Sequence, residues 1–214
     1  GSGKTTTLAA MVDFVNKNRN CHIITIEEPI EYLHQNINSI ITQRQVGPHT
    51  DSFSSALRVA VRQDPDVIMV GEMRDLETIS TALTTAETGA LVFGTLHTDN
   101  AAKTINRIIN VFPFEQRSQV RTLLSETLTG VVAQQLLTRA DGKGMVAAAE
   151  ILIGIPAISN AIREGKIEQM ISIMETGRRY GMQILDEHLL ELMQNCVVTP
   201  EVARRKARNK RLFQ

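Results

Sequence analysis

Short apolar runs alternate with amphipathic segments along the first two thirds of the chain. The apolar runs lie at residues 21–26, 67–70 and 91–96, are rich in Ile and Val, and end at polar or turn residues. Each run is too short for a buried helix and therefore predicts a strand. Strands that alternate with helices indicate βα units around a mostly parallel sheet.

Helical patterns fill the segments between these runs. One helix is expected over residues 51–63 and a second over residues 75–88, with Gly89 as its C-terminal cap. A third is expected over residues 115–131. The stripe of the first helix consists of Phe53, Ala56, Leu57, Ala60 and Val61.

The pattern changes in the last third of the chain. Residues 139–144 form a polar loop, and residues 145–153 predict another strand. Only helical patterns follow Pro156, which predicts an α/β core over residues 1–153 and a small helical subdomain over residues 154–214. The helices of this subdomain are expected at residues 157–163, 167–175, 182–194 and 200–209.

Composition agrees with a folded protein that has no general affinity for polyanions. The chain has 214 residues, of which 43% are hydrophobic and 21% charged, and its formal net charge is zero. A substantial core can therefore form, and the molecule as a whole has no electrostatic reason to bind nucleic acid or anionic lipid. Residues 204–214 are an exception, because they carry six Lys or Arg and no acid.

The two cysteines and the hydropathy pattern indicate the cellular compartment in which the protein is expected. Cys21 and Cys196 lie far apart and match neither a disulfide framework nor a zinc-binding spacing, which favours reduced thiols in a cytosolic protein and no zinc. No run of about 18 apolar residues occurs. We therefore expect no direct membrane insertion, and any contact with a membrane to be made through partners.

The chain opens on the second half of a phosphate-binding pattern, G-x-x-x-x-G-K-[ST]. Glycines let backbone N–H groups converge on phosphate oxygens, Lys4 reaches the β and γ phosphates, and the Thr5 hydroxyl binds Mg²⁺. The first glycine and the preceding strand do not occur, so the match is partial and a truncated N-terminus is expected. A non-native Gly-Ser-Gly leader is the alternative, but it leaves Lys4 and Thr5 unexplained. The candidate nucleotide-binding residues are Gly1, Ser2, Gly3, Lys4, Thr5 and Thr6.

Carboxylates follow the first two predicted strands. Glu27, Glu28 and Glu31 come at the end of residues 21–26, where open α/β sheets place their ligands, and they can hold Mg²⁺ through water or orient the attacking water. Surface acids at a strand end are the alternative. The strand at residues 67–70 leads to Glu72, a Walker B arrangement in which Glu72 accepts a proton from the water that attacks the γ-phosphate.

Two further side chains complete the predicted site. Arg74 can neutralise developing negative charge on the phosphate. His97 follows the third strand, where it can sense the γ-phosphate or relay its state to a neighbouring subunit. A lone His at a strand end is more often structural, so only its neighbours favour this role.

The order of these motifs resembles the secretion ATPase superfamily, and specifically the pilus retraction (PilT-like, twitching motility) ATPases. Residues 26–32 resemble the Asp box of that family, residues 67–75 its Walker B motif and residues 89–98 its His box. The resemblance implies a RecA-like P-loop ATPase core that uses ATP and Mg²⁺. It makes Glu72 the catalytic carboxylate, assigns His97 to conformational coupling, and matches Arg58, Arg62 and Arg74 to arginines near phosphate or across subunit contacts.

Residues 157–166 resemble the C-terminal motif of the retraction enzymes. Pilus assembly and type II secretion relatives usually carry a four-cysteine zinc module, which two distant cysteines cannot build. Both points favour retraction, although a helix start after Pro156 also explains the first. The candidate motif residues are Ala157, Ile158, Ala161, Ile162 and Arg163.

The resemblance also implies an assembly and a partner. A homohexamer would bind ATP between subunits at the cytoplasmic face of the inner membrane and move a pilus platform protein. The family's N-terminal domain is missing here, Glu28 replaces the usual Asp, and Ala90 stands where many relatives have a His. An assembly or type II secretion ATPase is the first alternative. A nucleic-acid-binding or translocating ATPase ranks lower, because the basic tail lacks interleaved aromatic residues except Phe213.

Overall fold

The computed structural model describes residues 1–213 and divides into two compact units. The first unit comprises Gly1–Gly3, Thr98–Asn110 and Phe114–Gln214, and the second comprises Lys4–His97 and Val111–Pro113. The predicted boundary between residues 153 and 154 falls inside the first unit, so it does not coincide with this division. Gln214, the last residue of the predicted helical subdomain, lies outside the described residues.

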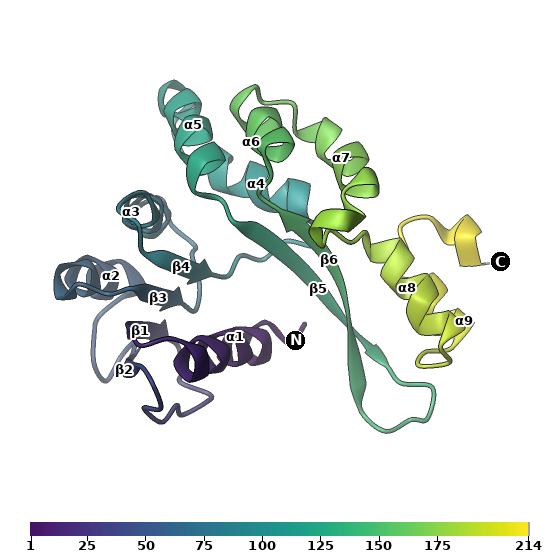
Figure 1. The fold of residues 1–214 in the computed structure, drawn as a ribbon, viewed down its shortest axis with the longest axis horizontal. Helices are drawn as coiled ribbons and strands as arrows, with labels where there is room; N and C mark the ends of the chain where they lie inside the picture. Colours follow the sequence, from purple (N-terminus) through teal and green to yellow (C-terminus); the bar gives the residue numbers. More distant parts are fainter. Residues whose placement is uncertain (214) are drawn as a thin grey trace. The chain divides into compact units, whose positions relative to one another are not determined.

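A four-stranded parallel sheet forms the centre of the second unit (Figure 1). Its strands run in the order β2 (Ile40–Gln45), β1 (His22–Glu27), β3 (Val67–Val70) and β4 (Leu91–Gly94). The three predicted strands are confirmed with small shifts at their ends. β2 was not predicted, because its two isoleucines are followed by polar residues and the strand lies at a half-buried edge of the sheet.

The helices of the second unit cover both faces of this sheet. Ile23, Val67 and Met69 pack against α1 (Lys4–Asn18), whereas Ile24 and Ile68 belong to a core with residues of α2 (Phe53–Ala60) and α3 (Leu76–Glu87). Successive side chains of a strand point to opposite faces, so β1 and β3 bury side chains on both sides of the sheet. β3 is therefore apolar throughout, and β1 is apolar at Ile23, Ile24 and Ile26, while its buried Thr25 and Glu27 are hydrogen-bonded to each other.

The first unit combines an antiparallel hairpin with helices. The strands β5 (Gly130–Thr138) and β6 (Met145–Ile153) pair along their whole length. Single 3-10 turns occupy Phe114–Gln116, Ile167–Gln169, Arg178–Tyr180 and Lys210–Phe213. The helices are α4 (Ala101–Asn110), α5 (Arg117–Thr127), α6 (Pro156–Arg163), α7 (Met170–Thr176), α8 (Leu185–Gln194) and α9 (Pro200–Lys206).

The predicted helix over residues 115–131 is wrong at its C-terminal end. The helix stops at Thr127, and Gly130 and Val131 already belong to β5, where they pair with Ile153 and Leu152. This pairing of distant residues overrides a local helical pattern. The hairpin partner of the predicted strand at residues 145–153 was therefore missed, and so was α4.

Two C-terminal helices are shorter than predicted. Gln183 pairs with Ile151 of β6 through two backbone hydrogen bonds of 2.8 and 2.9 Å, which keeps the chain extended until α8 begins at Leu185. α9 ends at Lys206, because the backbone of Ala207 turns extended and the next two N–H groups bind Asp186. Side-chain contacts of this kind leave no periodic signal in the sequence.

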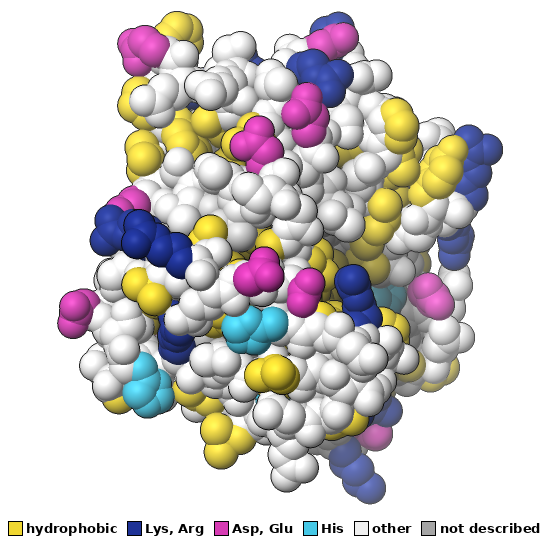
Figure 2. Space-filling model, turned by 60° about the vertical axis from the view of Figure 1, so that its left-hand side comes forward, with side chains coloured by type: hydrophobic (Ala, Val, Ile, Leu, Met, Phe, Trp, Pro, Cys, Tyr) yellow, Lys and Arg dark blue, Asp and Glu magenta, His cyan; other side chains and the backbone are white. Residues whose placement is uncertain are grey.

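Three further observations concern the surface charges, the helices and the side chains that could bind a metal ion. Acidic and basic side chains are interspersed in small groups on the face that Figure 2 shows. Within residues 1–213, no helix is both long and apolar enough to cross a membrane. In the same part of the chain, no group of three or more His, Cys, Asp or Glu is arranged to hold a metal ion.

The start of α3 gives a prediction about stability. The Asp75 carboxylate caps this helix by accepting from Thr78 N at 2.8 Å. We expect Asp75→Ala to lower the free energy of unfolding by about 0.5–2 kcal/mol, because the helix loses its N-cap. Thermal unfolding measures the change, with Asp75→Asn as the matched control, since Asn caps equally well. Equal loss of stability in both variants would refute this role of the cap.

Candidate active site

The C-terminal ends of β1, β3 and β4 are joined at one edge of the sheet. Gly71 N donates to Ile26 O at 2.8 Å, and Met73 N donates to Thr95 O at 3.0 Å. The Thr95 hydroxyl donates to Gly71 O. A Cβ at Gly71 would lie only 3.1 Å from Ile26 O, so a residue without a side chain suits this approach. The residues that follow β1, β3 and β4 therefore begin side by side at one edge of the sheet.

Glu72 lies at this edge with most of its side chain buried, since only 15% of it is exposed. Oε2 accepts from Arg74 Nη2 at 2.5 Å, while Oε1 accepts from Arg74 Nε and lies 2.6 Å from His97 Nε2. An ionised carboxylate only accepts hydrogen bonds, so His97 must carry its proton on Nε2. Two carboxylate oxygens offer about four acceptor positions, and these contacts leave one position open on Oε2.

The same contacts determine the ionisation states of Glu72 and Arg74. The hydrogen bond from Arg74 lowers the pKa of Glu72 below its usual value of 4.5; partial burial opposes this shift, and the hydrogen bond and charge of His97 add to it. The pKa of Arg74 is raised, chiefly by its hydrogen bond to Glu72. Glu72 is therefore an ionised acceptor at neutral pH.

The acidic residues after β1 divide into two kinds. Glu27 is buried, and its Oε1 accepts from the Thr25 hydroxyl at 2.6 Å and from Gln43 Nε2 at 3.0 Å, so it is held within the sheet. Glu28 and Glu31 are exposed. The charge of Glu28 is a minor cause of the raised pKa of Arg74, after its hydrogen bond and ion pair with Glu72.

The start of α1 lies at the edge of the sheet that carries Glu72. In the first turn of α1, Thr6 Oγ1 lies 3.0 Å from the hydroxyl of Tyr32, which follows the end of β1. Near the other end of the helix, Asn16 O accepts from Asn38 N at 3.0 Å, just before β2 begins. α1 therefore runs antiparallel to the strands, with Lys4 and Thr5 at the end from which the strands exit.

The residues before Lys4 form a turn that requires glycine. Gly3 has a φ of +81°, and a Cβ there would lie 2.7 Å from Gln134 Nε2. Gln134, on β5, donates this nitrogen to Ser2 O at 2.6 Å. Sequence reasoning missed Gln134 because its strand was not predicted. Two adjacent glutamines, Gln134 and Gln135, within an otherwise apolar run were the available signal.

The three candidate arginines have different environments. Arg74 contacts Glu72, whereas Arg58 forms an ion pair with Glu77 that joins α2 to α3. Arg62 is exposed after the end of α2. The structure therefore brings one of the three to the candidate catalytic carboxylate.

The candidate retraction motif lies on α6 and the turn that follows. Ile158, Ala161 and Ile162 are buried, while Ala157 and Arg163 are exposed. Arg163 Nη1 donates to Asn160 Oδ1 at 3.3 Å. The apolar members therefore pack the helix, and Arg163 is available on the surface.

Comparison with known proteins identifies close relatives. Residues 1–212 match the family described as type II/IV secretion system protein. A twitching motility protein of Neisseria gonorrhoeae is 56% identical over 209 residues, which are 98% of this chain and 56% of that protein. A type IV pilus retraction ATPase, PilT, of Pseudomonas aeruginosa is 55% identical over 208 residues, which are 97% of this chain and 60% of that protein.

Solved structures agree with these relatives. A crystal structure of the pilus retraction motor PilT with bound ADP matches with a TM-score of 0.91 and 49% identity, over 99% of this chain and 60% of that one. The ATPase DotB of Legionella pneumophila matches with a TM-score of 0.86 and 30% identity, over 96% of this chain and 57% of that one. The expected RecA-like fold and the resemblance to retraction ATPases are confirmed. This chain spans 56% and 60% of the two sequence relatives, and it belongs to the type II/IV secretion system protein family.

Proposed function

We propose that this chain is the nucleotide-hydrolysing part of a motor ATPase that drives retraction of type IV pili. The arrangement of Glu72 between Arg74 and His97 carries the proposal. It supplies an ionised, largely buried acceptor at the edge of the sheet where α1 begins. The names of the two closely similar relatives, a twitching motility protein and a pilus retraction ATPase, support the biological task.

The residues that precede and open α1 fit a nucleoside triphosphate. The glycine conformation at Gly3 allows backbone N–H groups to turn toward phosphate oxygens, and the N-terminus of α1 adds positive potential. Lys4 binds the β and γ phosphates, with Gly1, Ser2 and Thr6 completing the loop. Thr5 would hold Mg²⁺ through its hydroxyl, with Glu28 acting through water; the bound ion neutralises phosphate charge.

Glu72 performs the proton transfer in this proposal. The open acceptor position on Oε2 takes the proton of the water that attacks the γ-phosphate, and the lowered pKa keeps the carboxylate ionised until that step. Arg74 and His97 fix the orientation of the carboxylate. Arg74 also offsets negative charge that develops on the phosphate, and His97 senses whether the γ-phosphate is present. Glu27, Glu31, Arg58 and Arg62 have supporting roles in coupling.

The proposed function also implies an oligomeric state, a location and a partner. We place the protein as a homohexamer in the cytoplasm, at the inner face of the membrane, where it acts on a pilus platform protein. The exposed Arg163 within the candidate retraction motif supports contact with a partner or a neighbouring subunit. Nucleic acid is a poor fit, since the basic tail lacks interleaved aromatic residues except Phe213 and its Arg208 pairs with buried Glu150.

The first test of hydrolysis is Glu72→Gln in a chain extended upstream so that the phosphate loop is complete. Gln keeps the shape of the side chain but accepts no proton, so we expect turnover to fall at least about 100-fold while nucleotide still binds. Phosphate release and fluorescent-nucleotide titration measure the two effects. Lys4→Ala is the contrasting variant, because it should abolish binding itself. Normal turnover in Glu72→Gln would exclude Glu72 as the base.

A second prediction concerns the pH dependence of turnover. Arg74 is the largest cause of the lowered pKa of Glu72, so Arg74→Ala should let that pKa rise toward 4.5. The carboxylate then protonates at a higher pH during acidification, and the acid limb of the kcat profile moves to higher pH. Arg62→Ala is the control, since the lowered pKa of Glu72 is caused by Arg74 and His97 and not by Arg62. An unshifted limb in Arg74→Ala would contradict the assignment.

A third prediction separates retraction from assembly or secretion. Arg163→Ala should leave piliation intact but abolish twitching, because the motif serves pulling rather than extension. Hyperpiliated, non-twitching cells are the expected phenotype, scored by surface pilin and colony spreading. Glu168→Ala is the control, since Glu168 is exposed in the turn that follows and lies outside residues 157–166. Loss of pili in Arg163→Ala would favour an assembly or secretion ATPase.

A further inference from the structure

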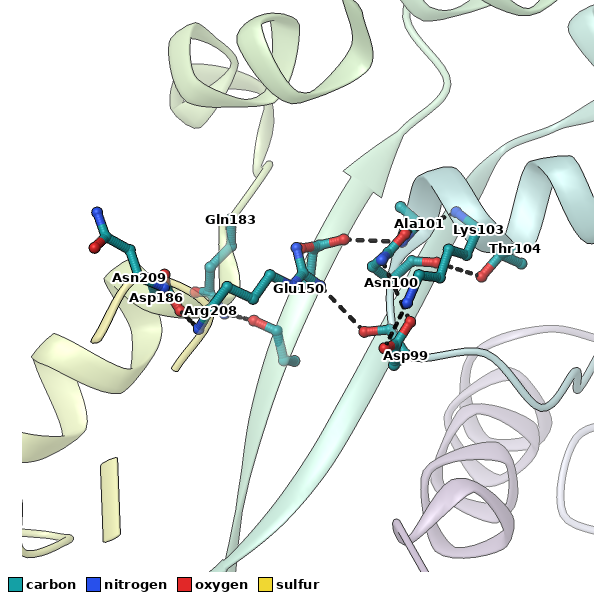
Figure 3. A network of polar contacts seen from close by, with 11 residues as sticks. Asp99, Asn100, Ala101, Lys103, Thr104, Glu150, Gln183, Asp186, Arg208 and Asn209 are labelled. Atoms are coloured by element: carbon teal, nitrogen blue, oxygen red, sulfur yellow. Dashed lines mark hydrogen bonds and ion pairs between the residues drawn. The ribbon is translucent and has the colours of Figure 1, made fainter. Parts of the chain in front are cut away.

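A buried carboxylate on β6 joins two segments that are distant in sequence. Glu150 is 4% exposed. Its Oε1 accepts from Ala101 N, at the first residue of α4, at 2.8 Å, and its Oε2 accepts from Arg208 Nη1 (Figure 3). One side chain therefore caps the start of α4 and binds the C-terminal segment at once.

Arg208 also contacts the segment just before α4. Its Nη2 donates to Asp99 O at 3.1 Å, so the guanidinium group contacts both β6 and the segment that leads into α4. The backbone of the C-terminal segment is held separately, because Arg208 N and Asn209 N donate to the two oxygens of buried Asp186 at 2.9 and 2.8 Å (Figure 3). The side chain of Arg208 can therefore be removed without releasing the backbone.

The segment that Arg208 holds is continuous with His97. Thr98 and Asp99 directly follow His97 in the sequence. Thr98 Oγ1 lies 2.7 Å from Thr104 Oγ1, and Lys103 N donates to Asn100 Oδ1 at 2.7 Å, so the first turn of α4 is organised around these residues. His97 and Asp99, whose carbonyl Arg208 binds, are therefore separated by Thr98 alone.

Burial decides which of these ion pairs holds the C-terminal segment. A buried ionised carboxylate is strongly destabilised when its partner is lost, so Glu150 resists separation from Arg208. The exposed ion pair between Asp99 and Lys103, with an N–O distance of 2.9 Å, contributes little by comparison. The C-terminal segment is therefore fastened through Glu150 and the Asp99 carbonyl.

We propose that Arg208 is a positioning residue that couples the C-terminal segment, residues 207–213, to the nucleotide state sensed at His97. The inference rests on the proposed function, since it requires His97 to respond to nucleotide. Coupling is reciprocal: nucleotide changes the mobility of residues 207–213, and loosening Arg208 changes the response of the His97 segment. A merely structural ion pair has neither effect.

The test uses the chain extended upstream to a complete phosphate loop, as wild type, Arg208→Ala, Arg208→Lys and Arg205→Ala. Hydrogen–deuterium exchange with and without ADP, steady-state turnover, and thermal unfolding are measured on each. Arg205 is the matched control, because it is an exposed arginine of the same tail that pairs only with exposed Glu201. If Arg208→Ala does not fold, Glu150→Gln replaces it, since Gln still accepts from Ala101 N.

Coupling predicts that ADP alters exchange in residues 207–213 of the wild type and of Arg205→Ala, but not of Arg208→Ala. The kcat of Arg208→Ala should fall at nearly unchanged KM, with partial rescue by Arg208→Lys. Wild-type kcat and a retained ADP response in Arg208→Ala would overturn the inference, as would an activity loss that only follows the folded fraction. A wild type that binds ADP without turnover refutes the proposed function instead, and the exchange comparison still decides the coupling.

Discussion

Parallel pairing of β1, β3 and β4 brings the last residues of the three strands to one edge of the sheet. β1 and β3 are buried on both faces, so their register is fixed by packing against α1 on one side and α2 and α3 on the other, while β4 is half-buried. Backbone bonds from Gly71 and Met73 then lock the exits of the strands to one another. The positions of Glu72 and His97 follow from this pairing.

Charge at the edge of the sheet is organised around a single carboxylate. Glu72 is largely buried, yet its pKa is lowered, because the hydrogen bond from Arg74 outweighs the opposing effect of burial. His97 donates to the same carboxylate and continues directly into the segment held by Arg208 and Glu150. The residue that contacts Glu72 is therefore separated from Asp99, whose carbonyl Arg208 binds, by Thr98 alone.

The sequence predicted those parts of the fold that depend on local pattern. The runs that became β1, β3 and β4 were found because each is a short, mainly apolar segment bounded by polar or turn residues, and Glu72 and His97 followed as strand-end residues. β2 and β5 were missed, because an edge strand and a hairpin strand are stabilised by partners distant in sequence. Gln134 and Arg208 were missed as contacts for the same reason, since their partners, Ser2 and Glu150, lie far from them in the chain.

The most direct measurement is a structure of the chain, completed at its phosphate loop, with Mg²⁺ and a non-hydrolysable ATP analogue. The account predicts one triphosphate at the sheet edge, with Lys4 on its β and γ phosphates, Glu72 Oε2 facing the attacking water, and His97 beside the γ-phosphate. A triphosphate bound elsewhere, or Lys4, Glu72 and His97 on separate surfaces, would contradict it.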